Sequence, residues 1–108
     1  MAFKIAKNPT FTADVEVFTP NDRCGHDRST FKAKFFQAKT EELADLRKLE
    51  QPDVLRRKLA GWDDLYDDNN APVEFNSDNI ESLLNIPEAV AALSLSFWGS
   101  IIKSREKN

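Results

Sequence analysis

Two stretches near the start of the chain alternate apolar and polar residues at every second position, and this pattern restricts the fold more than any other. A period of two is typical of a β-strand that has one face against a core and the other in solvent. The apolar positions are Phe11, Ala13, Val15 and Val17 in the first stretch and Phe31, Ala33 and Phe35 in the second. We therefore predict two strands that pair as an antiparallel hairpin, joined by a long polar loop over Thr19–Ser29.

The charges at the intervening positions support the same pairing. In an antiparallel arrangement, Asp14 and Glu16 lie on the same outer face as Lys32 and Lys34. Each cross-strand pair of opposite charges adds about 0.2–1 kcal/mol. An isolated hairpin is only marginally stable in water, so the rest of the chain must cover its apolar face.

The residues from 40 to 61 are predicted to be helical. Thr40 is expected to cap the start, and leucines recur after it at helical spacing. Proline is tolerated in the first turn of a helix but not in its interior, so Gln51-Pro52 is expected either to break this helix or to begin another. Gly61 stands where a residue in the left-handed conformation would end the segment.

The residues from 62 to 75 form a crossover with a polar turn cluster at 67–70. Both a tight second hairpin and an irregular loop fit this composition, and we expect a loop with short extended pieces. Another helix is predicted to follow, because Asn76 can cap it. Phe75 and Ile80, on either side of that cap, have the spacing of a hydrophobic staple.

The last helix is predicted to begin at Pro87 and to end near Lys103. Its apolar face is wider than packing on one small hairpin needs. Leu95 falls outside the main apolar stripe, and with Trp98 and Ile102 it forms our candidate partner-binding surface, because exposed apolar patches mark interaction sites. The alternative, which we favour for Trp98 in a small domain with two tryptophans, is that this side chain fills the core.

Length and composition are those of one ordinary globular domain: 108 residues, of which 41% are hydrophobic and 31% charged. We predict an α+β fold in which an N-terminal antiparallel β-hairpin packs against three to four α-helices. Its expected parts are a hairpin region (1–39), a helical segment (40–61), a crossover (62–75), C-terminal helices (76–103) and a tail (104–108). A single cysteine, no signal-like start and no long apolar run lead us to expect a cytosolic protein without a membrane contact.

Few side chains could carry catalysis or hold a metal ion. Cys24 and His26 form the only cluster of ligand types, whereas a tetrahedral zinc site needs four ligands. As a nucleophile and its base, this pair would lie on a glycine-bearing loop that is poorly suited to hold it. An EF-hand calcium loop beginning at Asp63 would need glycine at its sixth position, which is Asp68. We predict no enzyme, no cofactor and no metal site.

The charge distribution limits the choice of partners. The net charge of −3 argues against a general nucleic-acid binder, although basic and aromatic residues are interleaved around Phe31–Phe36. In the predicted strand those aromatic and basic side chains face opposite sides. Residues 61–88 contain eight acidic residues and no Lys or Arg. We expect a solvated acidic surface there, and the alternative is a field that steers a basic partner.

The order of these motifs resembles the small tail assembly chaperones of long-tailed bacteriophages. The motifs are the opening hairpin, the helix end at Gly61-Trp62, the Pro72-Val73-x-Phe75 return with its capped helix, and the helix that begins at Pro87. The resemblance implies a non-enzymatic protein that binds and solubilises the tape measure protein, with the tail tube subunits as further partners. It also implies a location in the cytoplasm of the bacterial host and absence from the mature virion. Formation of a homo-oligomer stays open.

Two other functions fit the same residues. One is a small structural tail or connector protein of a phage or prophage, which would be found in purified particles. The other is an acidic inhibitor or adaptor of a host enzyme or nucleic-acid-binding protein, in which Asp63, Asp64, Asp67 and Asp68 would mimic phosphate groups.

Overall fold

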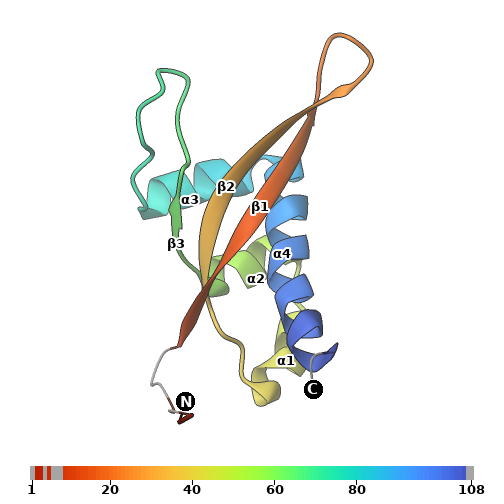
Figure 1. The fold of residues 1–108 in the computed structure, drawn as a ribbon, viewed down its shortest axis with the longest axis vertical. Coiled ribbons are helices and arrows are strands. Elements are labelled where there is room, and N and C mark those ends of the chain that lie inside the picture. Colours follow the sequence, from red (N-terminus) through yellow and green to blue (C-terminus); the bar gives the residue numbers. More distant parts are fainter. Residues whose placement is uncertain (1, 4, 6–8, 107–108) are drawn as a thin grey trace.

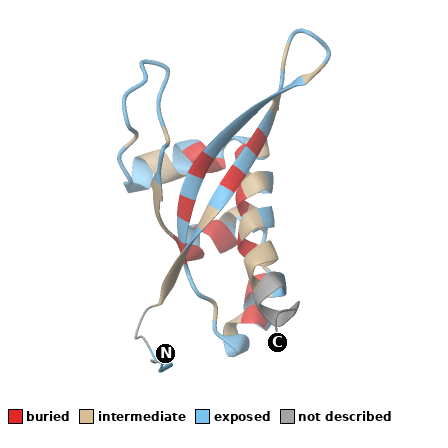
Figure 2. Cartoon of the chain, viewed as in Figure 1, coloured by how far each residue is buried: buried red, intermediate tan, exposed pale blue. Residues whose placement is uncertain are grey.

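The computed structural model describes residues 2, 3, 5 and 9–106 and shows an α+β fold (Figure 1). A three-stranded antiparallel sheet has the order β1-β2-β3. Helices α2, α3 and α4 lie on one face of this sheet, and the other face is open to solvent (Figures 1 and 2). The elements are β1 (Thr10–Pro20), β2 (His26–Phe36), α1 (Thr40–Arg47), α2 (Gln51–Lys58), β3 (Leu59–Asp63), α3 (Ser77–Leu84) and α4 (Pro87–Glu106).

The predicted hairpin is confirmed, with Asp14 opposite Lys32 and with the apolar and charged residues on the expected faces. The predicted loop over Thr19–Ser29 is wrong, because the strands continue to Pro20 and from His26 and leave a turn of five residues. The side-chain oxygen of Asn21 accepts hydrogen bonds from the backbone N–H groups of Arg23 (3.0 Å) and Gly25 (3.1 Å). These hydrogen bonds within residues 21–25 close the turn.

Gly61 does not end a helix. Helix α2 stops at Lys58, and the chain continues directly as β3, in which Gly61 lies opposite Lys34 of β2. The physical reason is the edge of β2: its main-chain groups need partners, and an extended segment after α2 supplies them. The predicted left-handed helix end is therefore wrong.

The helical segment is broken over residues 48–50, and Pro52 lies in the first turn of α2. Thr40 is the first residue of α1 rather than its cap, and Lys39 takes the cap position instead. The carboxylate of Glu42 fixes this start one residue earlier than predicted, because it accepts a hydrogen bond from the backbone N–H of Lys39 (2.9 Å). Its other oxygen lies 2.7 Å from the Lys58 ammonium at the end of α2.

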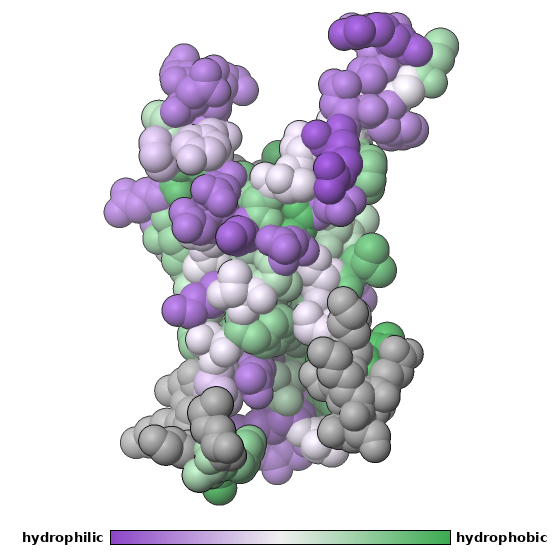
Figure 3. Space-filling view, viewed as in Figure 1, coloured by the Kyte–Doolittle hydropathy of each residue, from purple (hydrophilic) through white to green (hydrophobic). Residues whose placement is uncertain are grey.

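From Asp64 to Phe75 the crossover is a loop with short extended pieces, as predicted. Tyr66 and Pro72 form a β-bridge, and the backbone N–H of Val73 donates to the carbonyl of Leu65 (2.9 Å). The Trp62 indole N–H donates to the carbonyl of Val73 (2.8 Å) and ties the loop to β3. This loop and the tip of the β1–β2 hairpin form two strongly hydrophilic projections at one end of the molecule (Figure 3).

Helices α3 and α4 begin where the sequence predicts. The Asn76 side chain accepts from the backbone N–H of Asn79 (2.9 Å), as expected of the cap of α3. Phe75 packs its ring against Trp62, with centroids 4.8 Å apart, and its staple contact with Ile80 stays a prediction. Helix α4 continues to Glu106, beyond the expected end near Lys103.

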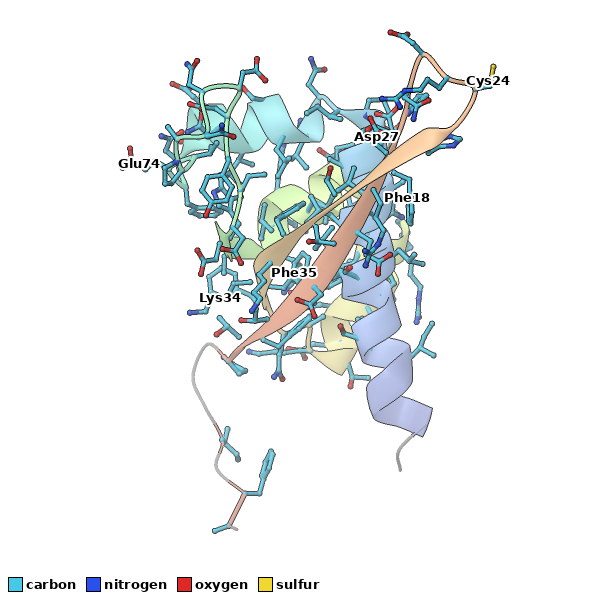
Figure 4. All side chains as sticks on the ribbon, turned by 45° about the horizontal axis from the view of Figure 1, so that its top comes forward. Phe18, Cys24, Asp27, Lys34, Phe35 and Glu74 are labelled. Atoms are coloured by element: carbon cyan, nitrogen blue, oxygen red, sulfur yellow. The ribbon has the colours of Figure 1, made fainter. Side chains whose placement is uncertain are left out.

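The core lies between the inner face of the hairpin and α4. Phe35 and Phe97 are fully buried, with ring centroids 5.4 Å apart, and Phe11 packs beside both. Phe35 points from β2 toward the helices, whereas its neighbour Lys34 points to solvent (Figure 4). The first strand and the last helix therefore share one core. The solvent-facing side of α4 lies beside β1 as a result.

Candidate partner-binding surface

The three predicted partner-binding residues lie in different environments on α4. Leu95 has 76% of its surface exposed and Ile102 has 56%. Trp98 is half-buried: its indole N–H donates to the side-chain oxygen of Gln51 (3.0 Å), and its ring packs edge-on against Phe97 at 5.1 Å. Leu95 and Ile102 are thus available to a partner, whereas Trp98 joins α4 to α2. Their role in binding stays a prediction.

Leu95 lies in a groove between the outer surface of α4 and strand β1. The groove has a volume of about 490 Å³. We call it the β1–α4 groove and define it by its lining residues: Asp14, Glu16, Phe18, Glu88, Ala91, Ala92, Leu95 and Ser96. A second hollow lies along the same two elements and shares Asp14, Leu95 and Ser96 with the groove. The structure therefore brings Leu95 into a surface with β1 and not only with the rest of α4.

Phe18 is a residue of this groove that sequence reasoning missed. It lies at the β1 edge of the hairpin, next to α4, and has 51% of its surface exposed (Figure 4). The signal was present in the sequence: Phe18 has the opposite phase to Val15 and Val17, so the period of two places this aromatic ring on the outer face. An aromatic residue on a solvated face is a candidate for recognition.

The rim of the groove is acidic. Asp14, Glu16 and Glu88 line it, and none of its lining residues is basic. Arg28 makes two bonds to the Glu16 carboxylate, at 3.0 and 3.2 Å, and these hydrogen bonds lower the pKa of Glu16 below its ordinary value. Asp14 and Glu88 form no ion pair with a described residue, so the groove carries negative charge at neutral pH.

The residues weighed for chemistry lie elsewhere. Cys24 is exposed at the hairpin tip, where its φ is 63°, and His26 begins β2. Of the crossover aspartates, Asp67 accepts hydrogen bonds from the backbone of Asn69 and Ala71 and so shapes its own turn. Within the described ranges, no three His, Cys, Asp or Glu side chains lie close enough together to hold a metal ion.

The family comparison decides the class of protein to which this surface belongs. Residues 1–108, the whole chain, match the family described as phage tail assembly chaperone. The chain belongs to the phage tail assembly chaperone family. No curated protein and no solved structure matches it significantly. Membership assigns this chaperone a role in the assembly of phage tails and agrees with the resemblance drawn from the motif order.

The apolar content of the chaperone's C-terminal helices raises the question of a membrane. Among the described residues, no single helix is long and apolar enough to cross a bilayer. Helices α3 and α4 reach that composition only when they are counted together, and they are bent by 100° where they meet.

Proposed function

We propose that this tail assembly chaperone binds the tape measure protein and keeps it soluble until the tail tube encloses it, without catalysing a reaction. The observation that carries the proposal is the β1–α4 groove, which leaves Leu95 and Phe18 exposed on a member of this family. Large apolar side chains that stay exposed beside a groove mark a site for another protein.

A tape measure protein suits such a site. It is long, and before assembly it exposes apolar segments that are later enclosed by tail tube subunits. A chaperone that covers one such segment removes apolar surface from water, and the free energy gained is about 25 cal/mol per Å² buried. The acidic residues of the crossover and of α3 would keep the coated complex soluble. We propose that this takes place in the cytoplasm of the bacterial host.

Co-expression with the tape measure protein encoded nearest to this gene tests the proposal. We expect the tape measure protein to move from the insoluble to the soluble fraction and to co-elute with several copies of the chaperone. A tape measure protein that stays insoluble and forms no complex would contradict it. Mass spectrometry of purified virions should find no copy of the chain, whereas stoichiometric copies would favour a structural tail protein.

A further inference from the structure

We infer that the β1–α4 groove takes an extended segment of the partner, which adds as a strand to the free edge of β1 and carries basic residues among its apolar ones. The inference rests on the proposed function, because the segment would belong to the tape measure protein. It adds the conformation of the segment, its charge and the main-chain groups that hold it.

The hydrogen bonds at both ends of the hairpin show which residues of β1 face its free edge. The carbonyl of Pro9 accepts from the N–H of Gln37 (2.9 Å), and the N–H of Asn21 donates to the carbonyl of Gly25 (3.0 Å). In an antiparallel ladder, every second residue bonds to the neighbouring strand and the residues between direct their main-chain groups the other way. The odd-numbered residues of β1 therefore bond to β2, and the even-numbered ones face the free edge.

Helix α4 contacts this edge at Asp14. The Ser96 hydroxyl donates to the carbonyl of Asp14 (3.0 Å), which is the contact expected of an even-numbered residue. Beyond Asp14 the next two edge residues, Glu16 and Phe18, line the groove. Pro20 follows in the same phase, and because proline has no N–H it ends the edge available to a partner strand. The open edge thus coincides with the groove.

The same edge favours an extended segment over a helix. A helix laid in the groove would cover the free N–H and C=O groups of Glu16 and Phe18, and its own main-chain groups are already bonded within the helix. Burying these four groups without partners would weaken binding. An added strand supplies both donors and acceptors, and its alternate side chains can lie against Leu95 and Ala91 on α4.

Charge determines which extended segment fits. Asp14 and Glu88 line the groove without an ion pair among the described residues, while Arg28 already neutralises Glu16. A segment that places Lys or Arg beside these two carboxylates gains their attraction, whereas an acidic segment is repelled. The expected partner sequence alternates apolar residues with basic ones.

Overlapping peptides that cover the tape measure protein, each long enough to span the groove, are the probe. Hydrogen exchange of the whole chaperone, followed by NMR, should show slower exchange of the Glu16 and Phe18 amides when a basic, alternating peptide is bound. Peptide binding that leaves both amides unprotected would overturn strand addition and would indicate a helix or a different face.

Two variants at one position isolate the main-chain bond. Phe18→Pro removes the edge N–H, and Phe18→Thr removes the same ring but keeps that N–H. We expect Phe18→Pro to bind the peptide about tenfold more weakly than Phe18→Thr. Proline at this position loses the hydrogen bond to the peptide, and the carbonyl of the peptide that would accept it is left unpaired. Equal affinities would overturn the inference. If Phe18→Pro does not fold, the amide exchange of the unchanged protein decides the question.

Neutralising the rim tests the charge. Glu88→Gln should weaken binding of the basic peptide and reduce its dependence on salt, whereas Asp68→Asn on the crossover should change neither.

The experiments distinguish failure of this inference from failure of the proposed function. A chaperone that solubilises the tape measure protein while Glu16 and Phe18 stay unprotected retains the proposed function and loses this inference, and one that binds no part of the tape measure protein loses both.

Discussion

At the scale of single residues, Lys58 is the one charged side chain that is buried among the described residues. Its ammonium lies 2.7 Å from the Glu42 carboxylate, and Glu42 also accepts from the backbone at the start of α1. The hydrogen bond from Lys58, followed by the one from Lys39, lowers the pKa of Glu42 from its ordinary value of 4.5. One carboxylate thus holds the start of α1 to the end of α2.

Glu42→Gln should destabilise the protein by about 1–3 kcal/mol at neutral pH, because the buried ammonium loses its ionic partner while the amide oxygen can still accept a hydrogen bond. The side chain of Glu42 is 37% exposed, so screening places the loss toward the lower end. Because the folded state lowers the pKa of Glu42, its contribution is complete above pH 4.5 and is lost as the pH falls through the lowered value. Urea unfolding at several pH values should show the two proteins converging in acid, and a constant difference would contradict this assignment.

Leu95→Asp should reduce binding of the tape measure protein by about tenfold or more, because a charge would enter an apolar contact beside acidic neighbours. Tyr66→Asp is the matched control, since Tyr66 is also a large exposed side chain (55%) but lies on the crossover. Co-purification and the soluble yield of the tape measure protein measure the effect. If both variants bind equally well, Leu95 is not part of the partner surface.

At the scale of elements, the hairpin and the helix starts could be predicted because their signals are local. Asn76 is the clearest example. Its side-chain oxygen accepts a hydrogen bond from the backbone N–H of Asn79, as predicted for the residue that caps this helix. Asn76→Ala should lower the free energy of unfolding by about 1 kcal/mol, and Asn76→Asp, which keeps an acceptor, should cost little. Chemical denaturation distinguishes them, and an equal loss in both variants would mean that the cap bond is not the cause.

The outer half of the hairpin could not be predicted because its residues are mostly exposed, and strand β3 could not be predicted because its residues also fit a helix end. Arg28 and its neighbours in β2 are polar, and their pairing is supported by the bonds between Arg28 and Glu16 across the strands. In β3, Gly61 fits both a helix end and a strand, and only the vacant edge of β2 decides between them. The choice of Leu95 and Ile102 as surface residues could be predicted from helical periodicity. The contribution of β1 to the groove could not, because it depends on contacts between segments that are far apart in the sequence.

At the scale of the whole molecule, the core unites the first strand with the last helix. Phe97 is fully buried, and its ring centroid lies 5.4 Å from that of Phe35 and 6.3 Å from that of Phe11. Phe97→Ala should cost about 3–5 kcal/mol. A domain of this size has only about 5–15 kcal/mol of stability, so the variant should be close to unfolding at physiological temperature.

The thermal midpoint and the urea midpoint of Phe97→Ala measure this loss, with Phe97→Leu as a control that keeps most of the apolar volume. The control should lose much less stability than the alanine variant. A loss below about 1 kcal/mol for alanine would mean that the site collapses around the deletion and that Phe97 does not join the two ends of the chain.

The bond from Ser96 to Asp14 joins positions 82 residues apart and has a consequence for synthesis on the ribosome. The hairpin is translated early, while the helix that contacts this edge at Asp14 is translated later. At about 5–20 residues per second, that edge stays uncovered for roughly 4–16 s in every nascent chain. During this interval the growing polypeptide offers β1 to any other extended segment nearby, including the same segment of a chain on the next ribosome of the messenger RNA.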